Sequence, residues 1–153
     1  MTTLYLKTLI DAPIEIVFDA SRNIDLHMSS TTDTNEKAIA GVTSGLIAFN
    51  ETVTWKARHF GVFLTHTSQI TYFKFPTYFV DEMILGVFKS FKHQHRFKTI
   101  GKKTEMIDII TYELPFGFLG KLFNQLLLKK YLFKFIATRN LYLQKKYKYT
   151  TYK

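Results

Sequence analysis

The sequence contains no cysteine, which excludes disulfide bonds and thiolate chemistry. Proline and glycine are scarce, with 3 and 7 residues, and they form no flexible linker that would divide the chain. No apolar run reaches the roughly 18 residues that a membrane-spanning helix needs. The N-terminus also lacks the charged start and apolar run of a signal peptide. We therefore expect a cytoplasmic protein in which residues 1–153 form a single domain.

Acidic residues are missing from the end of the chain. Residues 114–153 carry nine Lys or Arg and no Asp or Glu, which accounts for the whole net charge of +9. Only 4 of the 21 basic residues are Arg, the side chain best suited to bidentate phosphate recognition, and no nucleic-acid motif occurs. Motifs for a hydrolase nucleophile, a phosphate loop or a dinucleotide are also absent. We therefore expect neither a nucleic-acid partner nor an enzyme of these classes.

Aromatic side chains are abundant, with 15 Phe and 9 Tyr. Hydrophobic periodicity predicts a strand at 4–9, a helix that begins at Pro13 and a second short helix at 24–28. Residues 29–50 are polar and are expected to form a loop with one irregular strand. Period-two alternation then predicts antiparallel strands at 52–60, 62–74, 78–85, 90–100 and 103–114. The chain after Gly120 is expected to form one long helix, so the fold class is α+β.

The long helix has two apolar faces. An angle of about 100° per residue groups one set of side chains, which we expect to pack on the sheet. This stripe consists of Leu119, Leu122, Phe123, Leu126, Phe133, Ala137 and Leu141. The opposite face carries Leu128, Tyr131, Leu132 and Phe135 among basic residues. Three interpretations of the opposite face stay open: burial beneath a kink near Leu127, a homodimer contact, or contact with an anionic membrane.

Four short segments carry a resemblance to a known superfamily. Their sequences are IDAPIEIVF at 10–18, FVDEM at 79–83, FKHQHRF at 91–97 and GFLG at 117–120. With the order of the elements, they make the chain similar to the START-like, birch-pollen-allergen-like (SRPBCC) superfamily, and to its small bacterial ligand-binding subgroup. The resemblance implies a helix-grip fold, in which a curved antiparallel sheet wraps around a long C-terminal helix. It also implies a hydrophobic cavity between sheet and helix, but no particular substrate.

Tight turns at Phe60-Gly61 and Gly101-Lys102, and a turn centred on Val87, predict the register of three hairpins. The same register places polar side chains on the face of the sheet that we expect to point inward. The predicted cross-strand pairs are Trp55 with His66, Asp81 with His93, His95 with Asp108, Phe97 with Met106, and Phe91 with Tyr112. The histidine–carboxylate pairs are interpreted as a satisfied polar network, as ligand anchors or as acid–base groups.

We interpret the protein as a non-enzymatic binder of a small hydrophobic molecule: a lipid, an isoprenoid or an aromatic compound. The expected cavity residues of the sheet are Trp55, His66, Phe79, Asp81, Met83, Phe91, His93, His95, Phe97, Met106, Asp108, Ile110 and Tyr112. Leu126, Phe133 and Ala137 are expected to close the cavity from the helix. The alternatives are a polyketide cyclase or dehydratase that uses a His–Asp pair, and a membrane-surface module that acts through the basic helix.

No metal, cofactor or catalytic residue is expected. His93 and His95 share one face of a strand, and a carboxylate from a neighbouring strand is a conceivable third ligand. That spacing is common by chance, however, and the sequence does not reveal the distances between the three groups.

Overall fold

The structure, a computed structural model, describes residues 1–148. Its seven strands are β1 Thr2–Ile10, β2 Lys37–Gly41, β3 Thr52–His59, β4 Val62–Lys74, β5 Tyr78–Leu85, β6 Ser90–Ile100 and β7 Lys103–Glu113. Its helices are α1 Ile14–Ser21, α2 Ile24–Ser30, α3 Gly117–Phe123 and α4 Lys129–Tyr147. A 3-10 turn covers Thr32–Thr34, and a π-helical turn at Asn124–Leu128 joins α3 to α4.

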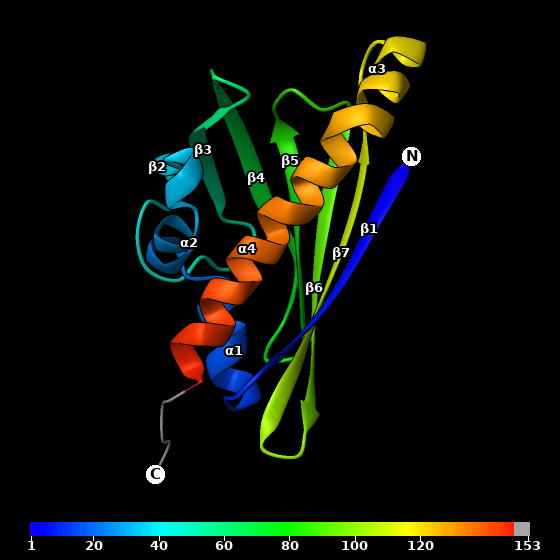
Figure 1. The fold of residues 1–153 in the computed structure, drawn as a ribbon. Helices are drawn as coiled ribbons and strands as arrows, with labels where there is room; N and C mark the ends of the chain where they lie inside the picture. Colours follow the sequence, from blue (N-terminus) through cyan, green and yellow to red (C-terminus); the bar gives the residue numbers. More distant parts are fainter. Residues whose placement is uncertain (149–153) are drawn as a thin grey trace.

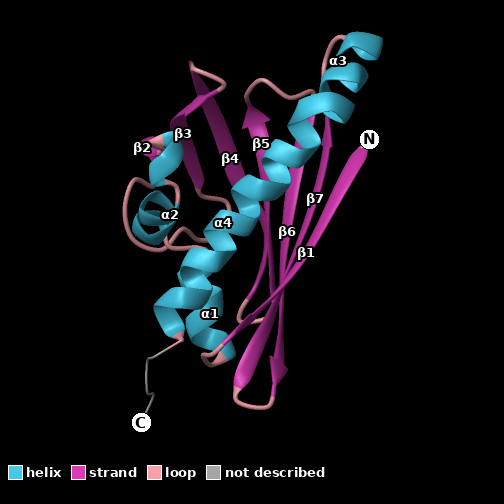
Figure 2. Cartoon of the chain, in the orientation of Figure 1, coloured by secondary structure: helices cyan, strands magenta, loops and turns pink. Residues whose placement is uncertain are grey.

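The strands form one antiparallel sheet in the order β1-β7-β6-β5-β4-β3-β2. In Figure 1, α4 crosses one face of this sheet diagonally, while α3 lies at the end of the molecule where β7 stops. The two short helices lie beside the C-terminal half of α4, and Figure 2 shows the strands gathered behind the helices. This is the α+β helix-grip fold that the resemblance implied.

Local chemistry explains where the two short helices begin. Pro13 precedes α1, where its missing N–H costs nothing, and Glu15 lies in the first turn near the positive end of the helix. The side chain of Asn23 caps α2 by accepting a hydrogen bond from the backbone N–H of Leu26. The apolar side of α1 buries Phe18, which fixes this helix against the sheet.

The strand predictions are confirmed, including the limits of β4, β5 and β6. The predicted cross-strand pairs also occur: Trp55 with His66, Asp81 with His93, His95 with Asp108, Phe97 with Met106, and Phe91 with Tyr112. The irregular strand expected within 29–50 is β2, which pairs with β3 through a bulge.

The prediction of which face of the long helix is buried is wrong. Leu126 and Phe133 are 65% and 47% exposed, and Leu119, Leu122, Phe123 and Leu141 are exposed as well. The buried residues are instead Leu128, at the end of the π-helical turn, and Ile136, Arg139, Asn140 and Leu143 of α4. Arg139 and Asn140 are polar, so an assignment by hydrophobicity alone places the wrong face of the helix against the sheet.

The opposite face, for which burial, a subunit contact and a membrane contact were all left open, is covered by the protein itself. Leu128 is buried, and Tyr131, Leu132 and Phe135 pack against the apolar cluster around it. The interpretation of burial is therefore correct for α4. The π-helical turn includes Leu127, near which a kink in the helix was expected. The interpretation of burial is wrong for α3, whose apolar side chains stay exposed. None of the described helices is long and apolar enough to cross a membrane.

Candidate functional site

A cavity of about 190 Å³ lies between the sheet and α4. Its apolar wall on the sheet side includes Trp55, Phe79 and Phe91, and the helix contributes Leu132 and Phe135. These side chains belong to strands β3, β5 and β6 and to the inward face of α4. The cavity therefore lies where the resemblance placed it, although different helix residues close it.

Polar side chains gather on one part of the cavity wall, around the buried carboxylate of Asp108. The Oδ1 atom of Asp108 accepts hydrogen bonds from His93 Nε2 and Arg139 Nη2, each at 2.7 Å. Its Oδ2 atom accepts another from Asn140 Nδ2, also at 2.7 Å. Because two of these donors come from α4, the carboxylate links the helix to β6 and β7.

A second carboxylate, Asp81, lies beside the same histidines. His95 Nε2 donates a hydrogen bond to Asp81 Oδ2 at 2.7 Å, and His93 Nδ1 lies 3.9 Å from the same oxygen. The rings of His93 and His95 stack with their centroids 3.7 Å apart, and Phe79 stacks on the other side of His95 at 4.1 Å. The side chain of Asp81 retains 22% of its exposure, so this carboxylate is open to the cavity.

The hydrogen-bond partners differ from those that the register suggested. Asp81 lies opposite His93 but bonds His95, and Asp108 lies opposite His95 but bonds His93. Diagonal neighbours on one face of a sheet are within reach of long side chains. Replacing His95 would therefore not leave Asp108 unpaired, because His93, Arg139 and Asn140 hold it.

The electrostatics of the network keep both carboxylates ionised. Burial raises the pKa of Asp81, but the hydrogen bond from His95 and the proximity of His93 outweigh this effect and hold it at about 2. Burial opposes ionisation of Asp108 as well, yet the Arg139 guanidinium holds its pKa far below the usual range. Burial and the neighbouring His93 lower the pKa of His95 to about 4. At neutral pH, His95 is therefore neutral between two anions.

Another polar group lies on the wall near β3. The ring of His27 packs on Trp55 with the centroids 4.4 Å apart, and its Nε2 lies 3.3 Å from Glu36. Burial raises the pKa of Glu36, but the proximity of His27 outweighs this effect and lowers it. Burial also lowers the pKa values of His59 and His66. Sequence reasoning missed Glu36, because it lies within a segment expected to be loop.

The structure brings together some of the predicted site residues and separates others. Seven of them line the cavity: Trp55, His66, Phe79, Asp81, Phe91, His93 and His95. Others lie in the packed interior without lining it: Phe97, Met106, Asp108 and Ile110. Met83 and Ala137 are partly buried outside the lining. Leu126 and Phe133, predicted to close the cavity, point to solvent, and the helix closes it with residues that the prediction omitted: Leu132, Phe135, Ile136 and Arg139.

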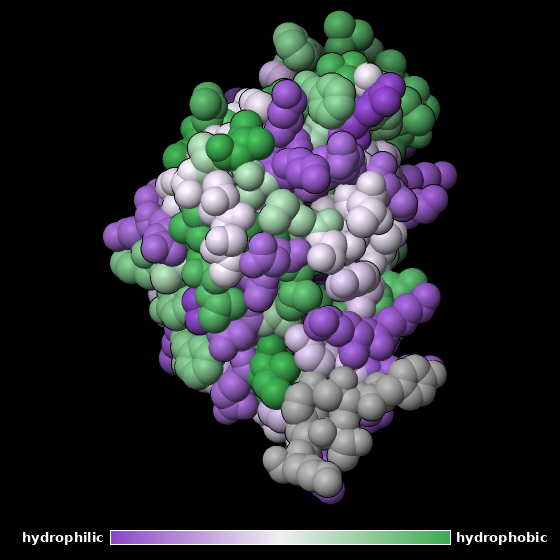
Figure 3. Space-filling view, turned by 90° about the vertical axis from the view of Figure 1, so that its left-hand side faces the viewer, coloured by the Kyte–Doolittle hydropathy of each residue, from purple (hydrophilic) through white to green (hydrophobic). Residues whose placement is uncertain are grey.

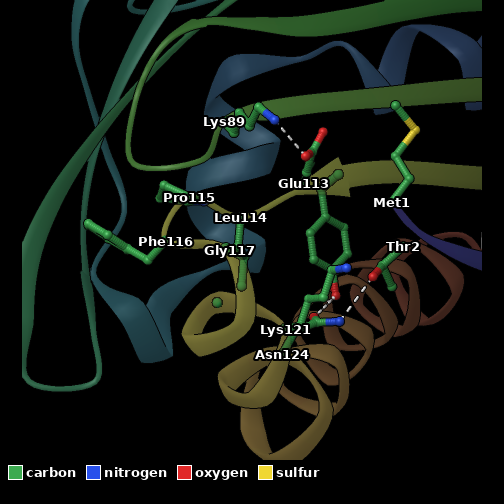
Figure 4. A pocket seen from close by; sticks show the side chains of 12 residues that line it. Met1, Thr2, Lys89, Glu113, Leu114, Pro115, Phe116, Gly117, Lys121 and Asn124 are labelled. Atoms are coloured by element: carbon green, nitrogen blue, oxygen red, sulfur yellow. Dashed lines mark hydrogen bonds and ion pairs between the residues drawn. The ribbon is translucent and has the colours of Figure 1, made fainter.

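A second hollow, of about 410 Å³, lies where β7 runs into α3 (Figure 4). Tyr112, predicted to line the main cavity, lies here and donates a hydrogen bond to Asn124, whose side-chain amide bonds Thr2. An ion pair of 2.7 Å joins Lys89 to Glu113 at its edge. The buried histidines and carboxylates lie instead along the first cavity, which we therefore take as the candidate site.

The sequence matches no known protein family and no curated protein. Solved structures do share its fold. A protein of Thermus thermophilus superposes with a TM-score of 0.78 at 16% identity, covering 95% of this chain and 96% of that one. A START superfamily protein from Mycobacterium smegmatis gives 0.73 at 10% identity, covering 97% and 99%. The major latex-like protein 151 of Panax ginseng gives 0.70 at 13% identity, covering 95% and 97%. At such low identities, the likeness establishes the START-like fold alone.

Proposed function

We propose that the protein binds a compact, largely apolar molecule that carries one polar group, in the cavity between the sheet and α4. The observation that carries the proposal is the composition of the wall. Aromatic and aliphatic side chains surround a small group of buried polar residues, of which Asp81 remains accessible from the cavity. Ligand sites commonly combine an apolar lining with a few polar groups that orient the ligand.

The size of the cavity narrows the ligand class. Its volume of about 190 Å³ is smaller than the roughly 300–1,000 Å³ of pockets for drug-sized molecules. A single aromatic ring system or a small isoprenoid suits this space better than a long acyl chain. A hydroxyl group suits the polar end, because anionic Asp81 accepts a hydrogen bond and the guanidinium of Arg139 carries N–H donors besides the one that bonds Asp108.

Binding is favoured over a cyclase or dehydratase because the network leaves little freedom for proton transfer. Asp108 is held by His93, Arg139 and Asn140, and its pKa lies far below neutrality. An efficient general base has a pKa near the working pH. Asp81, with a pKa of about 2, is also too weakly basic for this role.

The first test removes aromatic side chains from the two walls of the cavity, one on α4 and one on the sheet. Phe135→Ala removes an aromatic side chain from the cavity wall, and we expect it to weaken binding of an apolar fluorescent probe about tenfold, or ~1.4 kcal/mol. Phe91→Ala, on the sheet side, should act in the same direction. Probe fluorescence titrated against each folded variant provides the measurement.

Phe133→Ala is the matched control, since Phe133 lies on the same helix but is 47% exposed. It should bind the probe as the unaltered protein does. Equal losses in Phe133→Ala and Phe135→Ala, or no saturable binding at all, would contradict a site beneath α4.

A second function, docking on an anionic membrane, is favoured by the exposed surface of α3. Phe116, Phe118 and Leu119 are 82%, 77% and 69% exposed, and Leu126 and Leu127 extend the same surface. Figure 3 shows apolar side chains gathered at this end of the molecule. A contiguous patch of exposed apolar side chains on a protein surface commonly marks a site of contact with another protein or a membrane.

The charge of this segment favours an anionic membrane as the occupant of this surface. Lys121, Lys129 and Lys130 are exposed along the same helical segment, and residues 114–153 contain no acidic side chain. A symmetric contact with a second copy would bring like charges together, whereas anionic lipids attract each nearby Lys by about 1 kcal/mol. The apolar side chains would add insertion to this attraction.

We expect the double variant Phe118→Ser/Leu119→Ser to bind anionic vesicles at least tenfold more weakly in a flotation assay. Both side chains are exposed, so the variant should remain folded. The control, Leu141→Ser/Ile100→Ser, removes exposed apolar side chains away from α3 and should leave binding unchanged. Failure of the unaltered protein to prefer anionic over neutral vesicles would eliminate this function.

A further inference from the structure

We propose that Asp81, His93 and His95 form a binding site for a divalent transition-metal ion of the zinc class. Each residue contributes one potential ligand atom, and the three atoms lie within 4.8 Å of one another. The donor set of two imidazoles and one carboxylate suits zinc and the neighbouring first-row ions. The site shares Asp81 and the histidines with the cavity proposed above, but it does not depend on an organic ligand being bound there.

The distances fit a tetrahedral ion after a small adjustment. With metal–ligand bonds of about 2.0–2.1 Å, neighbouring ligand atoms in a tetrahedron lie roughly 3.3 Å apart. The separations from Asp81 Oδ2 are 2.7 Å to His95 Nε2 and 3.9 Å to His93 Nδ1. These two values bracket the required one, so the carboxylate needs to move by only a fraction of an ångström. The imidazole rings of His93 and His95, which stack with their centroids 3.7 Å apart, would also have to turn so that both nitrogens face the ion. Two histidines at positions i and i+2 of one strand already face the same side.

The surroundings supply the outer partners that metal-bound histidines require. A ligating imidazole normally donates its other N–H to a carboxylate or carbonyl, which fixes the ring. His93 Nε2 already donates to Asp108 Oδ1 at 2.7 Å, which leaves its Nδ1 free to face Asp81. Arg139 and Asn140 hold Asp108 in place from the other side.

His95 provides an independent indication. Within the described residues, its buried Nδ1 atom has no hydrogen-bond partner, although it lies 3.5 Å from Asp108 Oδ1. If Nε2 binds a metal ion, the single proton of the neutral ring moves to Nδ1 and points toward that carboxylate. Metal binding would thus satisfy a buried atom that is otherwise unpaired.

The fourth coordination position would face the cavity, because all three residues line it. Such an open position holds water or a heteroatom of a bound ligand. Asp81 and Asp108 together carry two negative charges against one positive charge on Arg139, so the site retains a net attraction for a dication.

Cobalt(II) provides the test, because tetrahedral Co²⁺ has a strong visible absorption. The full chain is first treated with a chelator and then titrated with Co²⁺, and Zn²⁺ is added to displace it. We expect one ion per chain and an affinity at least 100-fold lower in Asp81→Asn, which keeps an acceptor for His95. His95→Gln serves as a second variant and should lose the spectrum too. The folded state of each variant is checked by circular dichroism.

His66→Gln is the control, since His66 lines the same cavity but does not belong to the cluster. It should bind Co²⁺ within about threefold of the unaltered protein. Absence of the cobalt spectrum, or equal affinities in Asp81→Asn and His66→Gln, would overturn the proposal. Probe binding to the metal-free protein is measured separately, so that the metal site and the apolar cavity can fail independently.

Discussion

Arg139→Met should lower the free energy of unfolding by about 3–5 kcal/mol, the cost of removing one partner of a buried ion pair. The guanidinium lies 2.7 Å from the carboxylate of Asp108, and both side chains are buried. Without Arg139, an ionised carboxylate would remain in the interior with only neutral donors and its histidine neighbours. Urea unfolding followed by circular dichroism measures the loss.

Two further variants separate charge from packing. Asp108→Asn combined with Arg139→Met removes both charges and should recover a large part of the lost stability, because no unpaired ion remains. Arg96→Met replaces an exposed arginine that stacks on Tyr78 and should cost less than about 1 kcal/mol. A similar cost in Arg139→Met and Arg96→Met would contradict the role assigned to the buried pair.

The strands and their register were predictable because they depend on residues that lie close together in the sequence. Alternation with a period of two defines each strand, and the short turns between strands fix their register. The pairs of His95 with Asp108 and of Asp81 with His93 follow from this geometry alone. The hydrogen bonds between the same side chains do not follow, since a side chain reaches diagonally as easily as directly across.

The helix was harder to orient because its buried face is defined by a partner on the sheet. Arg139 and Asn140 face inward only because Asp108 lies beneath them. A hydropathy pattern assigns such residues to solvent and turns the apolar stripe inward instead. The exposed side chains of α3 have a similar origin, because the sequence does not reveal that this helix extends past the end of the sheet.

Lowering the pH should destabilise the protein at pH values well above those at which its carboxylates become protonated. Burial, with the neighbouring His93, lowers the pKa of His95 from 6.5 to about 4. Between these values the unfolded chain binds a proton that the folded protein does not, so the free energy of unfolding falls as the pH decreases. This single group should account for about 3 kcal/mol between pH 6.5 and 4. His59 and His66, whose pKa values are also lowered, act in the same direction.

The carboxylates extend the loss to lower pH. The folded pKa of Asp81, at about 2, lies below its ordinary 3.8, and that of Asp108 is lowered further. Their stabilisation is present above the ordinary value and disappears as the pH falls through the folded one. Urea unfolding of the unaltered protein and of His95→Gln, at several pH values from 7 down to 4, isolates the histidine. Over this range, the free energy of unfolding of the unaltered protein should fall by about 3 kcal/mol more than that of His95→Gln. Parallel curves would mean that His95 gains its proton in the folded protein as readily as in water, so that burial and the neighbouring His93 do not lower its pKa.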